Sequence, residues 1–181
     1  LRLCKACRPW FPAPSKQMAR SELALHFGDL IMLDYFFFRI GSGPSLVTLT
    51  FLLIVDDATR FRLVIFVPNR ETETLKIAFT QWTRIFGWPV VLASDEERSV
   101  LSREFQQWIE RRRVKYRPLL GGPSGRHTQA AVLNAISRVT RKTMHTISTE
   151  ATMLKIPLSP EELGAETSHA GNICALKNGS T

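Results

Sequence analysis

The sequence predicts an α/β fold, built on a mixed five-stranded sheet with helices on both faces. Three apolar segments joined by short polar links predict three antiparallel strands in a row. Farther along the chain, segments with helical periodicity alternate with two short apolar segments, which is typical of helices that connect further strands. The 181 residues are 44% hydrophobic, and this suffices for one packed core of ordinary size.

The predicted sheet begins with three strands. The first is expected at residues 30–38, where the segment LIMLDYFFF is apolar apart from Asp34. The turn GSGPS at 41–45 leads to a second strand at 46–57, and the polar link DDATR leads to a third at 61–68. Short links of this kind join antiparallel neighbours.

Beyond the third strand, apolar residues recur at helical spacing. Residues 71–87 form the first predicted helix, and Gly87 is of the type that commonly ends a helix. The remaining elements are expected in the order strand, helix, strand and long helix, at 89–95, 102–112, 114–119 and about 128–153.

The charge of the chain indicates a polyanionic partner. Its 24 Lys and Arg exceed its 16 Asp and Glu, which gives a formal net charge of +8 at pH 7. Nucleic acid and an anionic membrane surface both fit this charge. No apolar run approaches the roughly 20 residues that span a bilayer, and we expect no membrane partner. Three cysteines do not make a disulfide scaffold, so an intracellular setting is expected.

Two aspartates stand where a sheet of this kind presents a site. Asp34 lies within the first strand, and Asp95 lies at the carboxyl end of the fourth. If these strands are adjacent, the carboxylates repel one another unless divalent cations lie between them. Two metal ions can serve phosphoryl transfer, and Mg²⁺ prefers oxygen ligands. The alternative is structural, with Asp34 hydrogen-bonded in the core and Asp95 capping the next segment, and spacing alone does not decide between the two.

Six short segments occur in an order that is typical of one family. They are CKAC, LIMLDYFFF, LLIVDDATRF, FGWPVVLASD, SREFQQWI and GNICALKNGST. In order and spacing they resemble the catalytic core of retroviral and retrotransposon integrases, in the ribonuclease-H-like superfamily. The resemblance covers about Cys4 to Thr181, and it favours a retrotransposon polyprotein as the source.

The resemblance implies the activity and the partners of an integrase. Asp34 and Asp95 match the first two ligands of its Asp, Asp, Glu set, which holds Mg²⁺ or Mn²⁺ for two-metal polynucleotidyl transfer in DNA integration. The implied partners are DNA and further copies of the chain, and the implied location is the nucleus. Asp56 matches a position that the family uses for structure, so capping of a turn is favoured over catalysis.

The third acidic residue of that set is missing. The family carries a Glu in the first turns of the long helix, and the matching position here is Asn134, or Ala131 at a tighter spacing. Glu150 is 16 residues beyond Asn134, roughly 24 Å along a helix. Glu96 and Glu97 adjoin the second Asp on the chain and do not approach from the helix. We therefore expect weak metal binding and impaired catalysis, with a non-catalytic DNA- or protein-binding module as the alternative function.

Cations on the long helix and in the segment RRRVKYR are expected to contact DNA. One helix face presents Asn134, Arg138, Arg141 and His145, and an apolar face presents Leu133, Ile136, Met144 and Ile147. The apolar face is expected to pack on the sheet, leaving the basic face beside the site to neutralise phosphates. The segment adds Arg111, Arg112, Arg113, Lys115 and Arg117. A solvated helix face and charges that protect an edge strand are the alternatives.

The residues before the core predict part of a zinc module. Cys4 and Cys7 have zinc-ligand spacing, but a tetrahedral site needs four ligands. The resemblance implies that a histidine pair precedes Leu1, so Zn²⁺ is expected only together with upstream residues. The expected organisation is a basic Pro-rich arm at 1–27, an integrase core at 28–155 and a truncated C-terminal helical extension at 156–181.

Overall fold

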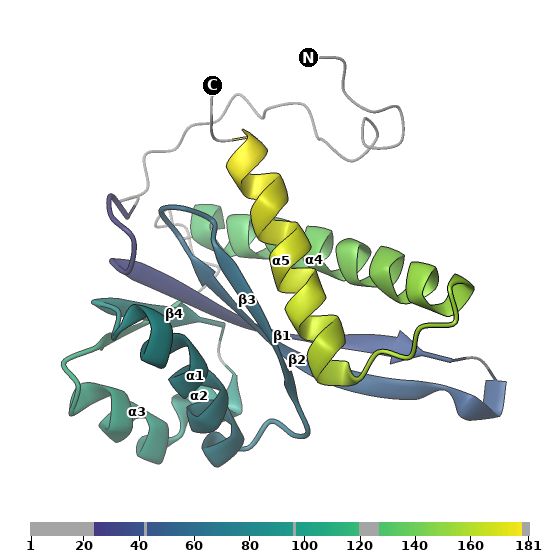
Figure 1. The fold of residues 1–181 in the computed structure, drawn as a ribbon. Helices are drawn as coiled ribbons and strands as arrows, with labels where there is room; N and C mark the ends of the chain where they lie inside the picture. Colours follow the sequence, from purple (N-terminus) through teal and green to yellow (C-terminus); the bar gives the residue numbers. More distant parts are fainter. Residues whose placement is uncertain (1–23, 42, 96, 120–126, 179–181) are drawn as a thin grey trace.

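A mixed five-stranded sheet forms the centre of the computed structural model, which describes residues 24–41, 43–95, 97–119 and 127–178 (Figure 1). The strands are β1 (Leu30–Ile40), β2 (Val47–Asp56), β3 (Arg62–Val67), β4 (Val91–Ser94) and β5 (Lys115–Pro118), in the order β3-β2-β1-β4-β5. Antiparallel pairing joins β1 to β2 and β2 to β3, and parallel pairing joins β4 to both β1 and β5. The predicted mixed sheet is therefore confirmed.

Helices cover both faces of this sheet (Figure 1). One face carries α1 (Thr72–Phe86), α2 (Arg98–Leu101) and α3 (Arg103–Glu110), and the other carries α4 (His127–Met153) and α5 (Pro160–Asn178). Alternation along β1 directs Ile31 and Leu33 toward the first group of helices. Met32 and Phe36 point toward the second group. Because all four are buried, this part of β1 is apolar on both sides.

The pairing register fixes where the two site aspartates stand. Leu33 of β1 lies opposite Ser94 of β4 in a parallel pair. Asp34 is the next residue along β1, and Asp95 is the next residue after β4. Both aspartates therefore leave this pair of strands at the same end, which is where open α/β sheets present their sites.

The segment after β4 forms two short helices where one was predicted to begin at 102. Helix α2 begins at Arg98, and Ser102 then starts α3 as its N-cap. The Ser102 hydroxyl accepts a hydrogen bond from the Phe105 backbone N–H at 3.2 Å, which satisfies one of the free donors of the first turn. The extra turn buries Val100 against the sheet, so packing extends the helical segment beyond its cap signal.

Helix α5 closes the outer edge of β3 with its side chains. Asn172 accepts a hydrogen bond from the Arg62 backbone N–H at 2.8 Å and donates one to the Arg62 carbonyl at 2.9 Å. Ser168 accepts one from the Val64 backbone N–H at 2.8 Å. Gly164 permits this approach, since a Cβ there would lie 2.8 Å from the Val64 carbonyl oxygen. The predicted extension at 156–181 thus contains a helix that packs on β3 and on α4.

Candidate functional site

Asp34 and Asp95 share one small cavity between β1, β4 and the start of α2. Its volume is about 80 Å³, and its lining also includes Leu33, Tyr35, Ser94, Glu97 and Val100. Asp34 is partly buried, whereas Asp95 is exposed. The structure therefore brings together the two aspartates that the sequence analysis selected.

The surroundings of Asp34 have opposing effects on the pKa of its carboxyl group. Burial raises the pKa of the Asp34 carboxyl above its ordinary value, and the negative charge of Asp95 adds to the rise. The Ser137 hydroxyl and the Arg141 guanidinium, both on α4, lower the same pKa. Burial is the largest of these effects, so the net result is a raised pKa. The ionised form of Asp34 is less favoured than that of an aspartate in water.

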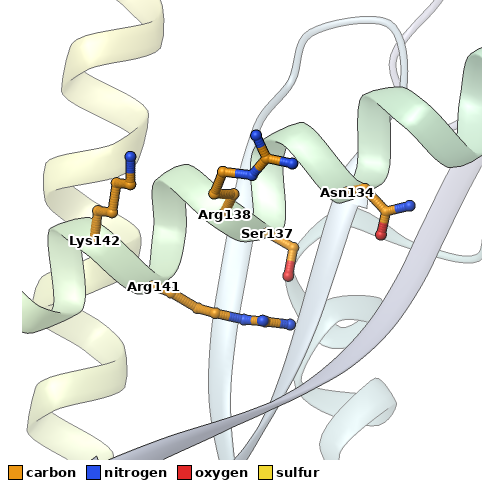
Figure 2. Close-up of a pocket in the computed structure, with 5 residues that line it drawn as sticks. All are labelled: Asn134, Ser137, Arg138, Arg141 and Lys142. Carbon is orange, nitrogen blue, oxygen red and sulfur yellow. The ribbon is translucent and has the colours of Figure 1, made fainter. Parts of the chain in front are cut away.

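Ser137 and Arg141 are the α4 side chains that reach the Asp34 region. Figure 2 shows both pointing from the helix toward the strands, whereas Arg138 and Lys142 point away. The Arg141 guanidinium lies 5.6 Å from the centre of the Phe36 ring, two residues beyond Asp34 on the same strand face. Ser137 is only 2% exposed, and its Oγ has no hydrogen-bond partner of standard geometry within the described structure.

The α4 residues that affect Asp34 are not the two that the sequence analysis matched to the missing Glu. Asn134 and Ala131 were expected beside Asp34, but both are exposed, and Ser137 is the buried residue that affects Asp34. The inward stripe of α4 comprises Leu133, Ser137, Thr140 and Met144. The match of Asn134 or Ala131 to the family's third acidic residue stays a prediction.

The donor set around Asp34 does not fit a pair of divalent cations. Within the described residues, no group of three or more His, Cys, Asp or Glu side chains could hold a metal ion. Glu97 lines the same cavity, but it pairs with Arg70 at 3.1 Å. Ser137 brings no charge, and Arg141 brings a positive one. Glu150 is exposed on α4, and Glu96 lies outside the described residues.

A hollow on α4 gathers the cations next to this site. It measures about 460 Å³ and is lined by Asn134, Ser137, Arg138, Arg141 and Lys142 (Figure 2). Lys142 was not among the expected residues, although its place one turn after Arg138 was a signal for it. His145 is exposed but does not line the hollow. The apolar face was predicted correctly, since Leu133 and Met144 are buried and Ile136 and Ile147 partly so.

The cations of RRRVKYR divide into two groups. Arg112 lies between two indoles, 4.7 Å from the ring centres of both Trp88 and Trp108. Arg117 donates a hydrogen bond to Gln129 at 2.7 Å and is partly buried. Arg112 is exposed but engaged by the two indole rings, whereas Arg111, Arg113 and Lys115 are exposed. β5 is an edge strand, as expected, and DNA contact by these residues stays a prediction.

Asp56 caps a turn, which confirms its expected structural role. It is fully buried and accepts hydrogen bonds from the Thr59 N–H at 2.8 Å and the Thr59 hydroxyl at 2.7 Å. Its other oxygen accepts the Gly28 N–H at 2.9 Å. The neighbouring Asp57 pairs with Arg60 in the same turn. The expected zinc ligands, Cys4 and Cys7, lie outside the described residues.

Comparison with known proteins identifies the fold. No family model matches the sequence, and no curated protein matches it either. Among solved structures, the HTLV-2 integrase catalytic core domain in complex with magnesium, in its dimeric form, matches with a TM-score of 0.59 at 14% identity, over 84% of this chain and 86% of that one. Its trimeric form matches with a TM-score of 0.55 at 16% identity, over 80% and 82% of the chains.

A third match is the intasome of simian T-cell lymphotropic virus in complex with PP2A regulatory subunit B56 gamma. Its TM-score is 0.66 at 13% identity, over 91% of this chain and 55% of that one. All three matches preserve the fold at an identity too low to carry function with it. The chain therefore has the ribonuclease-H-like fold of a retroviral integrase catalytic core.

Proposed function

We propose that this chain is the integrase core of a retroelement that binds DNA and carries out little or no strand transfer. The observation that carries the proposal is the cationic hollow on α4, which opens beside an aspartate pair that, within the described residues, belongs to no group of three or more metal-ligating side chains. DNA binding in the nucleus and assembly of several copies complete the proposal.

The hollow suits a phosphate backbone because its cations are close together and accessible. Arg138, Arg141 and Lys142 are all exposed, and they line a single surface of α4. Arg138 and Lys142 point away from the strands (Figure 2), which is the side from which a duplex lying along the helix would approach. Neutralising phosphates releases counterions, so such binding requires no particular base sequence.

Loss of catalysis follows from the donors that remain. In-line displacement with two metals needs one ion for the nucleophile and one for the leaving oxygen. Asp34 and Asp95 supply two carboxylates, and the α4 residue beside them is the uncharged Ser137. When bound, Mg²⁺ would supply the activation of both oxygens, and a two-carboxylate site holds the second ion poorly.

Two features of the solved structures support the proposed partners. The HTLV-2 core is described in dimeric and trimeric forms and in complex with magnesium, and the simian virus protein is described in an intasome. These descriptions favour DNA and further copies of the chain as partners. No helix in the part of the chain that the structure describes is long and apolar enough to cross a membrane.

Duplex binding at several salt concentrations tests the DNA proposal. The double variant Arg138→Ala, Lys142→Ala should weaken binding and flatten the salt slope by about 2, since each lost phosphate contact removes about one unit. The matched control is Arg84→Ala, Arg103→Ala, which removes the same charge from exposed positions of α1 and α3, on the face of the sheet opposite α4. Equal losses in the two variants would show that net charge, and not the hollow, governs binding.

A strand-transfer assay on a DNA end with Mg²⁺ or Mn²⁺ tests the catalytic half of the proposal. We expect no product above the level of Asp34→Asn, which serves as the blank. Robust activity that depends on Asp34 would overturn the proposed loss of catalysis, while leaving DNA binding intact.

A further inference from the structure

We propose that Ser137 stands at the position from which a third carboxylate would complete a metal site with Asp34 and Asp95, and that the Arg141 guanidinium takes the place of a metal ion opposite Asp34. This inference rests on the proposed function and deepens it, because it names the residues that exclude the metal.

The first part rests on the rotation of α4. Ser137 lies in the buried stripe of the helix, with Leu133 one turn before it and Thr140 and Met144 after it. Its hydroxyl is buried without a partner of standard geometry, although it lies close enough to influence Asp34. A buried hydroxyl without a partner costs free energy. Ser137 is therefore a buried polar residue on the stripe of α4 that faces Asp34.

The second part rests on the placement of Arg141. This residue follows Ser137 by one helical turn, so both side chains leave the same side of α4 (Figure 2). The Phe36 ring holds the guanidinium at 5.6 Å, and a cation over a ring face is attracted by it. Because Asp34 and Phe36 share one face of β1, the ring fixes the positive charge near the Asp34 carboxylate.

A guanidinium near Asp34 disfavours the binding of a metal ion there, because both carry positive charge. Asp34 and Asp95 are two acidic groups, and the positive charge of Arg141 acts on Asp34 by lowering its pKa. Two divalent cations would bring four positive charges into a site that already contains one. The site therefore selects against the metal both by the missing carboxylate and by the cation that is present.

Thermal unfolding with and without Mn²⁺ tests the position of Ser137. The natural chain should show no Mn²⁺-dependent shift, whereas Ser137→Glu should gain a rise of about 3–6 °C with Mn²⁺ at about ten times its dissociation constant. Asn134→Glu is the matched control, since it adds the same side chain one turn earlier and should show no shift. The double variant Asp34→Asn, Ser137→Glu should lose the gain.

Several outcomes would overturn this part. A shift in the natural chain would show that two carboxylates already hold the ion. A shift in Asn134→Glu but not in Ser137→Glu would restore Asn134 as the third position. If Ser137→Glu fails to fold, Ser137→Asp replaces it, and absence of a shift in a folded Ser137→Asp also counts against the proposal.

A double-mutant cycle tests the pairing of Arg141 with Asp34. Arg141→Met keeps an apolar stem on Phe36 but removes the charge. In the natural chain it should lower the Tm by about 2–4 °C more than it does in an Asp34→Asn background. Equal effects in the two backgrounds would show that Arg141 does not balance Asp34.

These readouts separate the inference from the proposed function. Metal-dependent stability and the Arg141 cycle are measured without DNA, so they stand or fall independently of the hollow. If duplex binding fails while Ser137→Glu gains its Mn²⁺ shift, the proposed function is wrong and the inference holds. If duplex binding succeeds and Ser137→Glu shows no Mn²⁺ shift, the proposed function holds and the inference is wrong.

Discussion

Leu33 of β1 pairs with Ser94 of β4, and this single pairing sets Asp34 and Asp95 side by side. A slip of one residue in that register would turn Asp34 to the opposite face of the sheet, away from α4. The pairing is held by the buried neighbours Met32 and Ala93, which lie opposite one another in the same ladder. The site is therefore positioned by the core and not by loops.

The first prediction concerns Asp34 and pH. Burial raises the pKa of its carboxyl in the folded state above the unfolded value. The folded protein thus binds this proton more tightly, and that contribution to stability is lost as pH rises through the folded-state pKa. Asp34→Asn should therefore raise the Tm at neutral pH, with a gain that shrinks under acidic conditions. Thermal unfolding across that range measures it, and an equal or lower Tm at neutral pH would contradict it.

A second prediction concerns the cap at Asp56. Asp56→Ala removes a fully buried carboxylate that accepts hydrogen bonds from two backbone N–H groups and one hydroxyl. We expect a loss of about 2–4 kcal/mol in the free energy of unfolding, measured with denaturant. Asp95→Ala, at an exposed aspartate, should change it by less than about 0.5 kcal/mol. Similar losses in both variants would argue against the cap.

The third prediction concerns the arginine between two indoles. Arg112→Ala removes two contacts with Trp88 and Trp108, each at 4.7 Å, and a hydrogen bond to the Trp108 carbonyl at 2.8 Å. The expected loss is about 1–2 kcal/mol in the free energy of unfolding, since contacts of this kind are weak at exposed positions. Arg111→Ala should cost less than about 0.5 kcal/mol. Tryptophan fluorescence should change only in the Arg112 variant.

A fourth prediction concerns the approach of α5 to β3. Gly164→Ala places a methyl group 2.8 Å from a backbone oxygen, so the helix must shift outward. We expect a loss of about 1–3 kcal/mol in the free energy of unfolding and faster amide hydrogen exchange at Arg62 and Val64. Gly171→Ala meets the flexible Arg62 side chain instead and should cost less. Slow exchange retained in Gly164→Ala would contradict this account.

The strands were predictable because their pattern is local. Unbroken apolar runs and turn residues identified β1 to β5, and the helix predicted from residue 102 begins at the residue that caps α3. The two aspartates were selected by their places in two predicted strands, and the pairing of β1 with β4 brings them together. A pattern that lies within one element can be seen in the sequence.

The site residues on α4 were less predictable because they depend on contacts between elements. The rotation of the helix is set by how Leu133 and Met144 pack on the sheet, and the length of the loop before it does not reveal this. Ser137 therefore escaped notice as a site residue. The engagement of Arg112 and Arg117 within the fold was hidden for the same reason, since their partners are distant in sequence or on another element.

The contact of α5 with β3 makes the two edges of the sheet different. Asn172 and Ser168 satisfy outward backbone groups of Arg62 and Val64, so another chain cannot pair with this first part of β3. At the opposite boundary, β5 has the exposed Lys115 beside it and the exposed Arg113 just before it. Strand addition by a second copy is therefore hindered at both edges of the sheet: by α5 at the start of β3, and by the repulsion of like charges at β5.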